Sequence, residues 1–181
     1  MHTLVRKALE IYINEKRVIT QADFPIHLLP MLLKKNSIFV TLYHNWRVIA
    51  SSGRIQCQKE NTLYECIDNT LMCLKDPRFW ISLQNPENIK DIHIRVDSIS
   101  SEDRRMIHTI SELNIRDEWV LLLSQNLGTL SVVLPHMVLT DPTPERYFAF
   151  VCQKAWLDPN NITNSDYVLY ALKTTEYTDM V

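Results

Sequence analysis

Glycine is nearly absent from this chain: it occupies only two of the 181 positions, Gly53 and Gly128. Average usage of about 7% would give roughly a dozen. Loops that cradle a phosphate bring several backbone amides close to the ligand, and they need several glycines to do so. The sequence therefore excludes a P-loop and a dinucleotide-binding fingerprint, together with the kinase or hydride-transfer chemistry that such loops serve.

The length and composition are those of a globular protein. Apolar residues make up 46% and charged residues 22% of the chain, which can bury a sizeable core without disulfides or metals. We expect one domain over residues 1–181. The formal net charge of −2 gives no overall positive field, which argues against nucleic acid as a partner.

The chain carries no sign of export or of membrane insertion. Residues 1–16 are amphipathic and charged throughout, unlike a signal peptide, and no stretch approaches the roughly 18 apolar residues of a membrane span. We therefore expect a cytoplasmic protein with no membrane partner, in which cysteines stay reduced. Cys66 and Cys73, seven residues apart, share one helical face and are typical of buried thiols.

Hydrophobic periodicity separates the chain into helical and extended segments. Helical spacing predicts helices over 3–16 and 62–76. It also predicts a third helix, with Thr143 as its cap and Pro144 at its first position, and a short last helix from Ser165. Thr62 and Glu65 match a capping box. Extended patterns predict a β-meander over 38–57 with Gly53 in a tight turn, a strand over 89–99, and a hairpin over 119–134, while 106–113 fits either a strand or a helix.

The order of these segments points to a fold class. The strands come in antiparallel runs and do not alternate one by one with helices. We therefore predict an α+β fold, with a mostly antiparallel sheet and flanking helices.

Five segments, in this order along the chain, resemble motifs of the AMMECR domain family. They are "IFVTL" (38–42), "CLKDPRFWISL" (73–83), "IHIRVDSIS" (92–100), "LGTLSVVLPHMV" (127–138) and "FAFVCQKAWLDP" (148–159). Together they span nearly the whole chain. The resemblance implies a single compact α+β domain of two lobes, but it implies no particular reaction.

The best-known motif of that family, LRGCIG, would follow "IFVTL", but its cysteine is missing here. The corresponding stretch is "IASSGRI" (49–55), where Ser52 falls near the position of the cysteine, and Gly53 and Arg54 keep a glycine and an arginine in altered order. This departure puts any cysteine-dependent chemistry of the family in doubt.

The serines of this loop do not form a recognisable nucleophile. A serine nucleophile needs a base to take its proton, and neither Ser51 nor Ser52 lies in a G-x-S-x-G elbow. The favoured interpretation is a polar turn whose hydroxyls bond to nearby backbone. We therefore name no catalytic residue.

Asp76 and Arg78 lie at the end of the predicted helix over 62–76 and flank Pro77. An arginine there can hold an anionic ligand, and Arg54 can join it if the meander packs over the helix end. The candidate ligand-binding residues are therefore Ser51, Ser52, Gly53, Arg54, Asp76 and Arg78. The favoured alternative is structural: Asp76 and Arg78 bond to nearby backbone and lock the helix end onto the sheet.

Metal and cofactor chemistry find no support in the sequence. The six histidines are scattered along the chain: His2, His27, His44, His93, His108 and His136. They form neither an HxH nor an HExxH motif, so we predict no metal and no cofactor. The tryptophans Trp46, Trp80, Trp119 and Trp156 can stack on bases, but the negative net charge favours core or interface packing.

Two functional hypotheses follow. The leading one is a non-catalytic AMMECR-like scaffold that binds a protein partner, with self-association left open. The alternative is an enzyme or an enzyme accessory with a redrawn small-anion pocket near Ser52, Arg54, Asp76 and Arg78.

Overall fold

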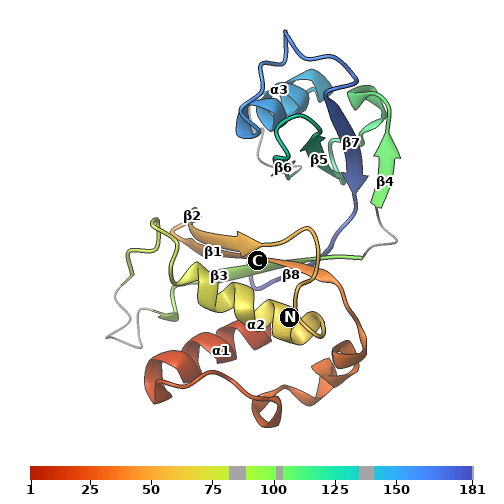
Figure 1. The fold of residues 1–181 in the computed structure, drawn as a ribbon. Coiled ribbons are helices and arrows are strands. Elements are labelled where there is room, and N and C mark those ends of the chain that lie inside the picture. Colours follow the sequence, from red (N-terminus) through yellow and green to blue (C-terminus); the bar gives the residue numbers. More distant parts are fainter. Residues whose placement is uncertain (82–88, 101–103, 135–140, 181) are drawn as a thin grey trace. The chain divides into compact units, whose positions relative to one another are not determined.

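The computed structural model describes residues 1–81, 89–100, 104–134 and 141–180. The chain divides into two compact units, and each has its own antiparallel sheet and its own hydrophobic core (Figure 1). Unit 1 comprises Met1–Ile99 and Thr175–Val181, and unit 2 comprises Ser100–Thr174. The prediction of an α+β fold is confirmed, with two separate sheets.

Unit 1 is a four-stranded antiparallel sheet with helices on one face. Its strand order is β2-β1-β3-β8. In chain order its elements are α1 (His2–Glu15), η1 (Gln21–Asp23), η2 (Ile26–Leu33), β1 (Ser37–His44), β2 (Arg47–Gly53), α2 (Thr62–Cys73), β3 (His93–Ile99) and β8 (Thr175–Thr178). The apolar stripe of α2 packs on alternate residues of β1, of which Ile38, Val40 and Leu42 are fully buried, and α1 packs against α2 and β3.

Unit 2 is a second four-stranded antiparallel sheet, with strand order β4-β7-β5-β6. Its elements are β4 (Arg104–Ile107), η5 (Ile110–Glu112), β5 (Trp119–Ser124), β6 (Leu130–Val133), α3 (Pro144–Lys154) and β7 (Tyr167–Leu172). Tyr147 and Val151 of α3 pack on one face of the sheet with Val120 and Leu122. The predicted hairpin, and the helix start with Thr143 as its cap, are confirmed.

The predicted helix from Ser165 is wrong, because residues 167–172 form β7. Val168, Leu169 and Leu172 fit a helical stripe, but they fit equally a strand that is apolar on both faces. The ladder with β5, which pairs Val120 with Ala171, decides in favour of the strand.

The predicted third strand of the meander and the Thr62 capping box are also wrong. No strand lies between Gly53 and α2, and Gly53 is the last residue of β2. Its lack of a side chain leaves room for the ring of Phe39 on the paired strand. Asn61, not Thr62, caps α2, since its side chain accepts a hydrogen bond from the Tyr64 amide at 3.0 Å.

Candidate functional site

The two loop serines lie on β2, at the edge of the unit 1 sheet, and point to opposite faces. The Ser51 hydroxyl is 3.3 Å from the hydroxyl of Thr41, its partner on β1. The Ser52 hydroxyl donates to Oδ1 of Asn69 on α2 at 3.0 Å. A hydroxyl and a neutral amide cannot take a proton from serine, so these contacts do not activate a nucleophile.

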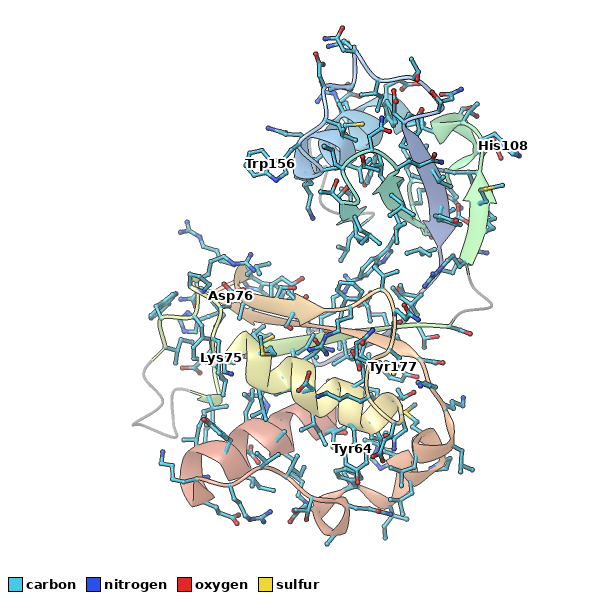
Figure 2. The ribbon with its side chains drawn as sticks, viewed as in Figure 1. Tyr64, Lys75, Asp76, His108, Trp156 and Tyr177 are labelled. Atoms are coloured by element: carbon cyan, nitrogen blue, oxygen red, sulfur yellow. The ribbon has the colours of Figure 1, made fainter. Side chains whose placement is uncertain are left out.

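Asp76 ties the chain after α2 to β2. Its Oδ2 accepts from the Ser51 amide at 3.0 Å and from Arg78 Nη2 at 2.7 Å, and its Oδ1 accepts from the Arg78 amide at 2.9 Å and from Arg78 Nε at 3.0 Å. The Arg78 hydrogen bonds, aided by the Ser51 amide, hold the pKa of Asp76 well below its usual range although burial opposes them. Asp76 therefore stays a carboxylate that satisfies an edge-strand amide (Figure 2).

The segment from Asp76 to Trp80 contacts the edge strand β2 and the end of β1. Asp76 bonds at Ser51, and the ring of Trp80 meets the ring of His44, beside the β1–β2 turn, at 5.2 Å between centroids and 90° between planes. Uncovered edge strands present unpaired amides to other chains. Asp76 satisfies one such amide of β2, that of Ser51.

Arg54 belongs to a second network, centred on the buried carboxylate of Glu65. Its Nη1 lies 3.1 Å from Glu65 Oε1, and its Nη2 lies 2.6 Å from Asp68 Oδ2. The amides of Gln58 and Lys59 each donate to Glu65 Oε2 at 2.9 Å. Burial alone would raise the pKa of Glu65, but these hydrogen bonds outweigh it and lower that pKa.

The structure therefore divides the predicted site residues between two ion-pair networks. Ser51, Asp76 and Arg78 form one, and Arg54 lies in the other, which Ser52 joins through Asn69. Any small anion has to compete with a carboxylate for either guanidinium. Anion binding by the six residues stays a prediction.

These motifs and this fold point to a known family. The AMMECR1 family model matches residues 2–177. The chain belongs to the AMMECR1 family. The crystal structure titled Uncharacterized Protein PH0010 from Pyrococcus horikoshii has a similar fold: its TM-score is 0.79 at 19% identity, over 98% of this chain and 88% of that one. No curated protein matches the chain.

Sequence reasoning missed the acidic and amide residues of α2 that organise this AMMECR1-family site. Glu65 and Asn69 are fully buried, although both types are usually exposed. Their spacing of four residues puts them on one side of the helix, next to the apolar stripe. A polar pair next to a buried stripe could have indicated a buried polar network on α2. Glu65 was instead interpreted as part of a capping box.

None of the four cysteines supplies a reactive thiolate in place of the motif cysteine. Burial, with a smaller contribution from the charge of Asp76, raises the pKa of Cys73 to about 12. Burial also raises the pKa of Cys66 to about 12 and that of Cys152 to about 11. Cys57 is half-buried, and its pKa is raised by burial and by the Glu65 charge.

The described ranges, which leave out His136, hold no group of three histidine, cysteine or acidic side chains placed to bind a metal ion. None of the helices there has the length and apolar character that a bilayer crossing needs.

The β1–β2 turn presents exposed aromatic rings. Asn45 and Trp46 both have left-handed backbones, with φ of 50° and 62°. Such two-residue hairpin turns favour Asn-Gly, so a tryptophan in the second position is strained. The Trp46 ring stacks on His93 at 5.5 Å and 19°, and Trp46 and Trp80 remain 68% and 67% exposed. We call Trp46, Trp80, His44 and His93 the aromatic end of unit 1.

Proposed function

We propose that this AMMECR1-family protein is a non-catalytic scaffold that binds a protein partner through the aromatic end of unit 1. The observation that carries the proposal is the exposure of Trp46 and Trp80, one of them on a strained turn. Tryptophan is enriched among the residues that dominate binding energy in protein interfaces. The proposal retains a cytoplasmic, single-domain protein without nucleic acid or membrane partners.

The exposed rings of this surface can contribute a substantial part of the energy that specific binding needs. A tryptophan buries about 150–250 Å² when fully covered. Trp46 and Trp80 are each about two-thirds exposed, so covering them removes roughly 100–170 Å² apiece from water. At about 25 cal/mol per Å², each contributes about 3 kcal/mol. The strained, left-handed backbone at Trp46 supports the proposal, because such strain clusters at functional sites.

The charged residues of the predicted pocket favour a scaffold over an enzyme. Arg54 and Arg78 are each held by carboxylates of this chain, and the hydroxyls of the two serines meet a hydroxyl and a neutral amide, neither of which is a base. Their contacts join a loop and a helix end to the edge of the sheet. These contacts give the residues a structural role, which supports the scaffold proposal.

A comparison of variants tests the proposal. Affinity-tagged wild-type protein, Trp46→Ala, Trp80→Ala and the matched control Trp156→Ala are used to recover partners, and each recovered protein is purified and titrated by calorimetry. We expect Trp46→Ala and Trp80→Ala to weaken binding at least tenfold, and Trp156→Ala to leave it unchanged. Equal binding by all four proteins refutes the proposed surface. Light scattering of the protein alone measures self-association.

The small-anion alternative has its own test. Native mass spectrometry of gently purified wild-type protein, Arg54→Ala and Arg78→Ala shows whether a small molecule copurifies and depends on either arginine. Such a molecule, or turnover of a metabolite that depends on Arg54 or Asp76, overturns the scaffold proposal in favour of an enzyme or an enzyme accessory.

A further inference from the structure

A second exposed surface of unit 1 lies on η2, away from the residues that carry the proposed function. The sequence of η2, IHLLPMLL, is apolar apart from His27, yet only Leu28 is fully buried. Ile26 is 84% exposed and Leu33 is 92% exposed. Single exposed aliphatic residues are common, but two on one short helix with this composition are not explained by folding.

The backbone that carries these side chains is firmly anchored. Leu28 packs in the unit 1 core, and its amide donates to the Pro25 carbonyl at 2.9 Å. At the other end the Lys34 carbonyl accepts from the Thr62 amide, at the start of α2, at 2.9 Å. The Asn36 amide donates to the Thr62 hydroxyl at 3.0 Å. A partner therefore meets a preorganised surface and loses little binding energy in ordering it.

The charge next to the exposed leucine is positive. Lys34 and Lys35 follow η2 directly and both are exposed. Within the described ranges neither ammonium group forms an ion pair. Asp68 on α2 pairs with Arg54 and Lys59. We define the η2 surface as the exposed aliphatic side chains at the two ends of η2 and the two exposed lysines that follow it: Ile26, Leu33, Lys34 and Lys35.

We propose that the η2 surface docks an acidic amphipathic segment of a partner protein. Leu33 and Ile26 would contact aliphatic side chains of the segment, and Lys34 and Lys35 would pair with its carboxylates. Anionic lipid fits this surface less well, because lipid-binding clusters commonly hold four to eight basic residues. The inference is independent of the aromatic end, because the two surfaces share no residue.

A synthetic peptide tests this docking directly. The probe is a 16-residue helical peptide with leucines along one face and glutamates elsewhere, titrated into ¹⁵N-labelled full-length protein. We expect shift changes at residues 26–35 that weaken with added salt. Leu33→Ser and the double variant Lys34→Glu/Lys35→Glu should each raise Kd at least tenfold. Because Leu33, Lys34 and Lys35 are exposed, these variants should keep the wild-type circular dichroism and Tm.

Matched controls separate the η2 surface from general charge attraction. Lys75→Glu/Lys90→Glu reverses two other exposed lysines of unit 1, and Val18→Ser removes another exposed aliphatic side chain, 48% exposed. Neither should change Kd more than twofold. Absence of binding at millimolar peptide, or equal weakening by the lysine control, overturns the proposal. Binding to vesicles with 30% phosphatidylserine without binding to the peptide overturns it in favour of a lipid surface.

Discussion

Replacing Trp156 with glycine should stabilise unit 2, although it removes an entire indole side chain. Helix α3 ends in a Schellman motif: the Trp156 amide donates to the Gln153 carbonyl at 3.1 Å, and the Leu157 amide donates to the Cys152 carbonyl at 3.0 Å. Trp156 takes the left-handed position of this motif, with φ of 61°. Glycine is the usual residue there because it has no Cβ.

The expected gain can be worked from the geometry. A left-handed backbone costs an L-residue roughly 1–2 kcal/mol. Glycine gives back roughly 0.4–1 kcal/mol by adding freedom to the unfolded chain. Trp156 is 88% exposed and projects from the end of α3, so little packing is lost (Figure 2). Trp156→Gly should therefore raise the free energy of unfolding by about 0.5–1 kcal/mol.

Urea denaturation followed by far-ultraviolet circular dichroism measures this difference, and thermal melting should show Tm rising by about 2 °C. The matched control is Trp156→Ala, which removes the same indole but keeps a Cβ in the left-handed conformation. It should not gain stability. If alanine stabilises the protein as much as glycine does, backbone strain is not the cause and the argument fails.

Three further results are expected of unit 1. Glu65→Ala should lower the free energy of unfolding by about 3–5 kcal/mol in urea denaturation, because it leaves Arg54 and two amides without their buried acceptor. The control Glu60→Ala, at an exposed position, should change that free energy little. Equal effects of the two variants would contradict this account. Because the pKa of Asp76 is lowered on folding, its stabilisation is complete above about pH 4 and is lost as pH falls toward the folded pKa. Asp76→Asn should therefore shrink the difference in the free energy of unfolding between pH 7 and pH 3. If that difference is the same in the variant and the wild type, the ion-pair assignment is refuted. A thiol reagent at pH 7.5 should label Cys57 slowly and leave Cys73 unlabelled until the protein unfolds, so fast native labelling of Cys73 would contradict its burial.

The local elements that the sequence predicted well are those with one clear period. The helix that begins at Pro144 has a Thr143 cap and one apolar stripe, and the hairpin at 119–134 has two strand patterns around a short polar turn. Residues 167–172 were misassigned because a strand that is apolar on both faces has no diagnostic period. The missed residue Glu65 looked like a surface cap, although the fold buries it completely.

The sequence by itself determined the α+β class, the exclusion of glycine-rich phosphate loops and the family to which the chain belongs. All three rest on residue type and order, which need no neighbours in space. Only the tertiary structure decided how the candidate site is divided. Ser51 and Ser52 are adjacent in sequence, but the alternation of a strand sends their side chains to opposite faces. The Ser52 hydroxyl thereby reaches Asn69 on α2, whereas Ser51 meets Asp76, just after α2, through its backbone amide.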